Sequence, residues 1–214
     1  MYRQFALLVL SAIATPVFAG SDVDGVIKGV EDAYSDVKSL KANFVQVTRS
    51  AAMGDETKQQ GQVFLKRPKM MRWEFTQPAG NTFVTNGSTM WVWSAAEKQV
   101  IVSKTGSGSG QRMAQLLDDL NRLGELFDAS LVDNTGHPNS VVLALTPKTD
   151  AGFQKLTLRL ASAGYEVEHV VMLDAFGNEV ELSFKQVKLN PEIQTERFTF
   201  AIPDGATVLN ADGP

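Results

Sequence analysis

The chain of 214 residues contains no cysteine and only two histidines. The lack of cysteine excludes disulfide bonds, thiol catalysis and thiolate-ligated zinc sites. His137 lies in a predicted turn and His169 in a predicted strand, and neither has a second histidine at the spacing of a metal site. We therefore interpret both as surface or structural residues and expect no metal ion.

Catalytic sequence motifs are also missing. The chain has no G-x-S-x-G, no P-loop and no G-x-G-x-x-G. Two glutamate pairs, Glu166 with Glu168 and Glu179 with Glu181, share predicted strand faces and could support acid–base chemistry. Solvated strand faces explain them more simply. The sequence therefore predicts a protein that is not an enzyme and that uses no cofactor.

The balance of charge is slightly acidic, with a net charge of −4. The sequence shows no basic patch of the kind that nucleic-acid-binding proteins use. Its negative net charge also disfavours electrostatic binding to anionic membranes. A domain of roughly 200 residues buries most of its surface without disulfides. We therefore expect one domain. We also expect the protein to act as a monomer.

The first nineteen residues resemble a secretory signal peptide. Arg3 supplies the positive start, residues 5–13 are mostly apolar, and Ala19 ends a segment suited to cleavage. A membrane anchor is the alternative, but the apolar run is shorter than the roughly 20 residues that a span needs. We predict a signal peptide over residues 1–19 and a mature domain over residues 20–214, whose net charge is −5 because Arg3 is removed.

Two helices are predicted from apolar residues repeating every three or four positions. The first covers residues 22–38, with Ser21 or Asp22 as its cap and with Gly25 and Gly29 weakening it by about 1 kcal/mol each. The second covers residues 112–127 and follows a Gly/Ser-rich hinge at residues 106–110. The apolar face of this second helix contains Met113, Leu116, Leu117, Leu120, Leu123 and Phe127.

The rest of the chain alternates between apolar and polar residues, which is typical of strands. We predict eleven strands, at residues 40–48, 61–66, 71–75, 81–85, 89–94, 99–103, 141–146, 155–160, 166–173, 179–188 and 198–201. Two amphipathic helices cannot cover both faces of so many strands. A curled antiparallel sheet with helices on its concave side is the simplest arrangement, and its interior could be solid or hollow.

One run of strands is unusually rich in tryptophan and methionine. Met71, Trp73 and Phe75 share a strand face, Phe83 follows, and the segment 90–93 reads Met-Trp-Val-Trp. Ordinary core packing and a pocket lining are both open interpretations. A lining is attractive because tryptophan and methionine offer large, adaptable surfaces to acyl chains.

Arg67 is the most distinctive charge. It follows a predicted strand, precedes Pro68, and is flanked by Lys66 and Lys69. A solvated basic cluster is one interpretation. The other is a latch, because a guanidinium has five donors and can bind several carbonyl groups at helix ends.

Seven segments form a recognisable set: residues 42–46 (Ala-Asn-Phe-Val-Gln), 61–68 (Gly-Gln-Val-Phe-Leu-Lys-Arg-Pro), Arg72-Trp73, Gln77-Pro78, Asn86-Gly87, Met90-Trp91 and Phe198-Thr199-Phe200. Together they resemble the periplasmic outer-membrane lipoprotein carrier (LolA-type) family. The resemblance covers nearly all of the mature chain and is strongest at the Lys-Arg-Pro segment.

The resemblance implies an α+β, mainly β fold: an unclosed antiparallel β-barrel of about 11 strands with a helical lid over an apolar cavity. It implies that Arg67 latches the lid, and that Met71 stands where relatives often carry phenylalanine. With the apolar strand surface, the expected lipid-binding cavity residues are Tyr34, Phe44, Met71, Trp73, Phe83, Trp91 and Trp93. The expected lid helix residues are Met113, Leu116, Leu117 and Leu120.

The same resemblance implies a carrier with three kinds of partner. These are acylated lipoproteins, an inner-membrane ABC-type complex that releases them, and an outer-membrane receptor that is itself a lipoprotein. A periplasmic sensor of lipid or mislocalised lipoproteins with the same fold is the alternative, although it would need an additional partner-binding domain. An enzyme acting on lipid or glycan is a third possibility, and it would require a buried acid or histidine in the pocket.

Overall fold

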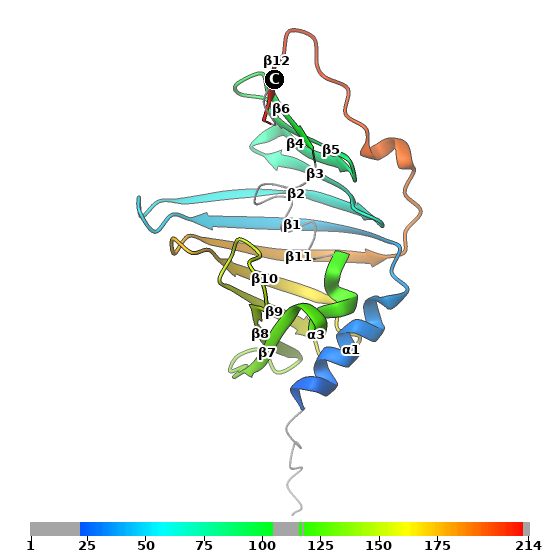
Figure 1. Cartoon of the computed structure of the whole chain (residues 1–214), viewed down its shortest axis with the longest axis vertical. Coiled ribbons are helices and arrows are strands. Elements are labelled where there is room, and N and C mark those ends of the chain that lie inside the picture. The colour runs from blue at the N-terminus through cyan, green and yellow to red at the C-terminus, as the bar shows by residue number, and fades with distance from the viewer. Residues whose placement is uncertain (1–21, 105–115, 117, 212–214) are drawn as a thin grey trace, which may run out of the picture.

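A computed structural model describes residues 22–104, 116 and 118–211. The predicted signal peptide at residues 1–19, the hinge at residues 106–110, and the lid residues Met113 and Leu117 lie outside the described residues. The remaining chain is dominated by one continuous sheet with helices at one end (Figure 1).

The sheet has twelve strands in the order β12-β6-β5-β4-β3-β2-β1-β11-β10-β9-β8-β7. Neighbouring strands are antiparallel except β12, which pairs with β6 in parallel. Its end strands, β12 and β7, do not pair with each other in the described part of the chain, so the sheet is unclosed. The strands are β1 (Ser39–Arg49), β2 (Glu56–Lys66), β3 (Met70–Gln77), β4 (Ala79–Asn86), β5 (Thr89–Ser94), β6 (Gln99–Lys104), β7 (Phe127–Val132), β8 (Ser140–Pro147), β9 (Lys155–Ala161), β10 (Val167–Leu173), β11 (Glu179–Leu189) and β12 (Thr207–Asn210).

The first predicted helix is confirmed as α1 (Val23–Ser35). The side chain of Asp22 caps it by accepting a hydrogen bond from the amide of Asp24. The buried stripe of α1 consists of Val26, Ile27, Val30 and Tyr34. This stripe packs against one face of the sheet, which we call the inner face; the opposite face is the outer face.

The second predicted helix is broken within its described residues. Leu116 and Asp118 are helical, and they are followed by a 3-10 turn, η1 (Asp119–Arg122), and by α3 (Leu123–Leu126). Phe127, predicted to be helical, instead begins β7. In the first turn of α3, where amides lack helical acceptors, the amide of Gly124 donates to the Glu31 carboxylate of α1 at 2.9 Å, so α1 caps this segment.

The C-terminal segment also differs from the prediction. The expected strand at residues 198–201 is absent, because Phe198 ends the 3-10 helix η2 (Thr195–Phe198) and is completely buried. Arg197 stacks over the ring of Phe64 on the outer face, with 3.7 Å to the ring centroid. The segment therefore crosses the outer face before its last strand, β12, reaches β6 (Figure 1).

Candidate functional site: an apolar cavity and an arginine latch

The inner face contains a cavity of about 440 Å³. This volume lies within the range of small-molecule pockets, roughly 300–1,000 Å³. Most of the lining is apolar, with a few amide and hydroxyl groups. The lining residues are Gln46, Thr48, Gln59, Trp73, Phe75, Asn81, Thr82, Phe83, Met90, Val92, Trp93, Ser94, Met172, Val180 and Leu182.

Three of the seven residues expected in the cavity line it: Trp73, Phe83 and Trp93. Strand register explains part of this grouping. Trp73 of β3 pairs with Phe83 of β4, which pairs with Val92 of β5, and directly paired residues share a face. The contributions from β10 and β11 (Met172, Val180 and Leu182) were missed because the strand order across β1 was not known.

Phe44 and Met71 lie behind the lining rather than in it. The Phe44 ring meets Trp73 edge-on, with ring centroids 4.5 Å apart. The Met71 sulfur accepts a hydrogen bond from Nε1 of Trp73 at 2.7 Å. Both residues are almost fully buried, so their effect is to fix the orientation of the Trp73 indole.

The expectation that Trp91 faces the cavity is not met. Trp91 pairs with Val84 of β4 and Val102 of β6, in the row that continues to Arg72 on the outer face. Met90 and Val92 line the cavity, and they point to the opposite side of β5 from Trp91 because successive residues of a strand alternate between faces. Trp93 lies on the same side of β5 as Trp91 but, near the end of the strand, still borders the cavity.

Arg67 makes four hydrogen bonds just after the end of β2. Its Nη1 atom donates to the main-chain oxygens of Tyr34 and Val37, each at 2.8 Å. Its Nε and Nη2 atoms donate to the Oδ1 and main-chain oxygen of Asp118, at 3.1 and 2.8 Å. We call Arg67, Tyr34, Val37 and Asp118 the latch.

The latch joins three segments that are distant in sequence. Tyr34 lies in the last turn of α1 and Val37 two residues beyond its end, where a cation is favourable because it faces the negative end of the helix dipole. Asp118 directly precedes η1, so the guanidinium connects β2 to both helical segments at once. Backbone acceptors at helix ends belong to one of the two interpretations of Arg67 that the sequence left open. The Asp118 carboxylate was not expected, because a surface acid on a predicted helix carries no signal of its partner.

Tyr34 is anchored at both ends. Besides its main-chain bond to Arg67, its hydroxyl accepts a hydrogen bond from the Val167 amide of β10 at 3.1 Å. Burial is the largest cause that raises the pKa of this hydroxyl, so it stays protonated. Tyr34 does not line the cavity; it fills the part of the inner face that α1 covers.

The described lid residues close the same part of the inner face. Leu116 and Leu120 are buried and belong to one apolar cluster with Val26, Ile27 and Val30 of α1. The inner face is therefore packed where the helices lie and hollow farther along the strands.

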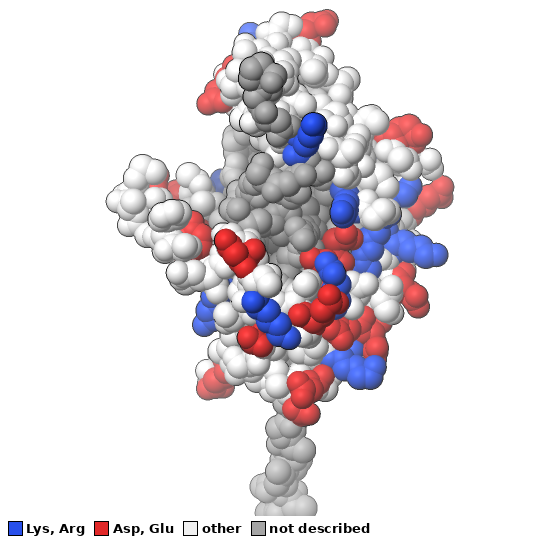
Figure 2. Space-filling model, viewed as in Figure 1, with Lys and Arg blue, Asp and Glu red and all other residues white. Residues whose placement is uncertain are grey.

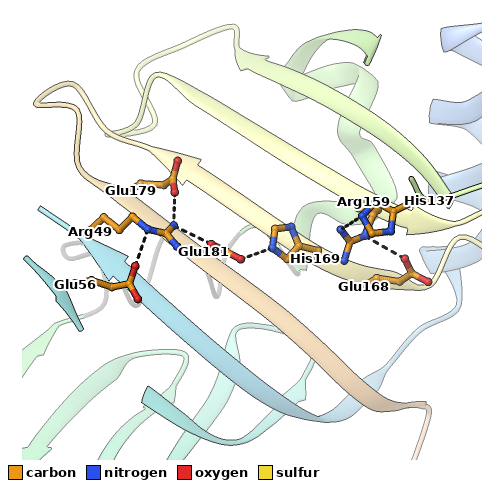
Figure 3. Close-up of polar contacts among 8 residues, drawn as sticks. All are labelled: Arg49, Glu56, His137, Arg159, Glu168, His169, Glu179 and Glu181. Atoms are coloured by element: carbon orange, nitrogen blue, oxygen red, sulfur yellow. Dashed lines mark hydrogen bonds and ion pairs between the residues drawn. The ribbon is translucent and has the colours of Figure 1, made fainter. Parts of the chain in front are cut away.

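Titratable groups gather elsewhere, on the outer face (Figure 3). His169 contacts the Glu181 carboxylate at 2.9 Å, and Glu181 also accepts from Arg49. His137 contacts Arg159 at 3.2 Å. Both histidines thus belong to a row of surface polar contacts, and neither is among the residues that line the cavity.

The described residues contain neither a metal-binding cluster nor a membrane-spanning helix. No group of three or more histidine, cysteine, aspartate or glutamate residues is placed to hold a metal ion. Among the helices described here, none is both long and apolar enough to cross a membrane.

Comparison with known proteins agrees with the geometry. A family model described as outer membrane lipoprotein carrier protein LolA matches residues 35–201. An outer-membrane lipoprotein carrier protein from Dechloromonas aromatica is 30% identical over 206 residues, covering 96% of this chain and 92% of the relative. One from Xanthomonas campestris pv. campestris is 30% identical over 211 residues, covering 98% of each.

Solved structures share the fold at lower identity. An uncharacterized conserved protein from Thermus thermophilus superimposes with a TM-score of 0.55 at 16% identity, covering 87% of this chain and 98% of the other. A DUF1329 family protein from Desulfovibrio piger gives a TM-score of 0.51 at 13% identity, covering 81% and 95%.

Proposed function

Because the chain belongs to the LolA family of outer membrane lipoprotein carrier proteins, we propose that it carries the acyl chains of lipoproteins across the periplasm. The single observation that carries the proposal is the apolar cavity of about 440 Å³ next to the helices that Arg67 holds. An apolar hollow with few directional partners suits a saturated chain better than a reacting substrate.

The energetics of acyl binding require a cost on the protein side. A chain of about 16 carbons gains roughly 12 kcal/mol on leaving water, and three chains gain roughly 35, at about 0.8 per methylene. Non-covalent affinity saturates near 20 kcal/mol. A carrier must therefore offset part of this gain, and breaking the latch and undocking the helices supply such a cost.

The closed state then drives release. When cargo leaves, α1 and the segment around Asp118 return to the inner face and Arg67 regains its four acceptors. No nucleotide is required for this step. The partners that fit such a cycle are an inner-membrane ABC-type complex that loads the carrier and an outer-membrane receptor that unloads it, with the carrier acting as a monomer exported by its signal peptide.

The test is to identify the ligand directly. The protein is purified from the periplasm under native conditions and analysed by mass spectrometry, and purified triacylated lipoprotein is then offered in detergent. We expect a triacylated lipoprotein to copurify and to form a one-to-one complex. Turnover of a lipid or glycan, with no stable complex, would contradict the proposal.

A further inference from the structure

Two exposed apolar side chains stand at the tips of neighbouring hairpins. Met53 is 77% exposed in the turn at residues 50–55, between β1 and β2. Phe176 is 85% exposed in the turn at residues 174–178, between β10 and β11. We call these two turns the paired tips, because β1 and β11 are adjacent strands and the turns lie at the same end of the sheet (Figure 1).

The tips are held against each other. The Ala51 amide of one tip donates to Oδ1 of Asn178 in the other at 3.1 Å. At their base, Arg49 binds three carboxylates: Glu56 at 2.9 Å, Glu179 at 2.6 Å and Glu181 at 2.8 Å (Figure 3). This guanidinium therefore ties β2, β1 and β11 together where both hairpins begin.

Each tip is also braced internally. Asp174 accepts hydrogen bonds from the amides of Phe176 and Asn178, at 2.8 and 2.9 Å. In the other tip, the Gly54 amide donates to the Ser50 oxygen at 2.9 Å. The polar groups of the turns thus hold their own backbone in place, while the phenyl ring and the thioether project outward.

The paired tips adjoin the cavity. Thr48 of β1 and Val180 of β11 line the cavity. The next residue toward the tip is Arg49 on β1 and Glu179 on β11. A surface that received Met53 and Phe176 would therefore lie next to the end of the hollow that the helices leave open.

We propose that the paired tips insert into the interface of a lipid bilayer with no net charge, such as one of zwitterionic phospholipids. The apolar residue of each tip is flanked by small residues, alanine and glycine, which allow the backbone to approach a lipid headgroup. Two isolated side chains can bury far less surface than the roughly 800 Å² that each partner buries in a specific protein interface. Shallow insertion of an aromatic and an aliphatic side chain matches interfacial membrane binding instead.

The charges near the paired tips indicate which kind of bilayer they can contact. The tips and their bases contain the acids Asp55, Glu56, Asp174 and Glu179, against one cation, Arg49, which is already bound. The projecting end is largely uncharged in the space-filling view, with acidic groups toward its base (Figure 2). An anionic surface would repel this end, whereas a zwitterionic surface would accept it.

The expected contact is weak. A single myristoyl chain gives an association constant of only about 10⁴ M⁻¹, and these two side chains bury less apolar area. Such a contact brings the open end of the cavity to a membrane briefly and lets the protein leave again.

Tryptophan fluorescence tests this proposal on the cargo-free protein with pure lipid vesicles. In Phe176→Trp, phosphatidylcholine vesicles should shift the additional emission to the blue, and brominated phosphatidylcholine should quench it, relative to wild type. Ile202→Trp is the matched control, because Ile202 is 45% exposed but lies on the C-terminal segment, and it should show neither effect. Adding Met53→Ser to Phe176→Trp should remove most of the shift.

Three outcomes would overturn the inference. These are no shift with Phe176→Trp, an equal shift with Ile202→Trp, or a stronger shift with phosphatidylglycerol than with phosphatidylcholine vesicles at low salt. A shift produced by a purified receptor protein but not by vesicles would assign the tips to a protein instead. Lipoprotein binding is measured separately, so failure here leaves the proposed carrier function intact, and failure to bind cargo leaves this membrane contact intact.

Discussion

Arg67 binds Asp118 through two different acceptors, the side-chain Oδ1 at 3.1 Å and the main-chain oxygen at 2.8 Å. The two residues are 51 positions apart, and the pair is mostly shielded, with side-chain exposures of 16% and 21%. A half-exposed ion pair would contribute little. Here the main-chain acceptors add charge-assisted hydrogen bonds, which makes this contact a suitable restraint on the helices.

Removing the guanidinium should release the helices. We expect Arg67→Leu to destabilise the closed state by at least about 1.5 kcal/mol, the lower value for one hydrogen bond to a charged group. Hydrogen exchange of the α1 amides should accelerate about tenfold, and the protein should retain cargo when offered a receptor. Arg67→Lys, which keeps the charge but loses the planar donor set, should be intermediate. Unchanged exchange together with unchanged transfer would show that Arg67 is not a latch.

A charge in the cavity should prevent cargo binding. Val92→Glu places a carboxylate among the apolar lining residues, where acyl chains would have to desolvate it. We expect complex formation with triacylated lipoprotein to fall at least about tenfold, which corresponds to 1.4 kcal/mol. Val45→Glu is the control, since Val45 is also a half-buried strand valine but points to the outer face, opposite to Phe44. Equal binding by the two variants would mean that this cavity does not hold the chains.

The two glycines of α1 should respond differently to alanine. Nothing lies within 4 Å of a methyl group added at Gly25, so Gly25→Ala should raise the free energy of unfolding by about 1 kcal/mol. A methyl group at Gly29 would overlap the Tyr165 ring, so Gly29→Ala should lose that gain or become destabilising. Urea denaturation measures both. In a Tyr165→Ala background, Gly29→Ala should behave like Gly25→Ala; if it does not, the ring is not the cause.

Acid should lower the stability of the protein by protonating Glu181, which contacts His169 and Arg49 on the outer face. The hydrogen bond from His169, followed by that from Arg49, lowers the pKa of this carboxyl from its ordinary value of 4.5. A group whose pKa is lower in the folded state stabilises the protein above its unfolded pKa, and this contribution is lost as the pH falls through the folded value. Between pH 5 and pH 3, roughly, wild type should therefore lose more stability than Glu181→Gln. Parallel acid unfolding curves for the two proteins would contradict this assignment.

The faces of the tryptophan-rich strand show where sequence reasoning ends. The segment Met90-Trp91-Val92-Trp93 is apolar at every position, so alternation could not indicate which residues face inward. Pairing with Val84 places Trp91 on the outer face, and that register is a property of the assembled sheet. Helix α1, in contrast, was predictable because its stripe of Val26, Ile27, Val30 and Tyr34 is apolar on one side only.

The C-terminal segment shows a similar limit. Phe198 and Phe200 alternate as in a strand, yet Phe198 is buried in a 3-10 helix. The main-chain oxygen of the next residue, Thr199, accepts a hydrogen bond from Arg72 at 3.2 Å. Tertiary packing therefore overrode local β-propensity.

The general architecture could be predicted from the sequence alone: helix, strands, helix and strands around an apolar interior, with Arg67 next to a strand end and without thiols. These properties follow from local periodicity and from the chemistry of single residues. The contact between Asp118 and Arg67, the contribution of β10 and β11 to the cavity, and the juxtaposition of the turns that hold Met53 and Phe176 arise from the folded arrangement. Each of these depends on strand order and register between distant segments, which local composition does not encode.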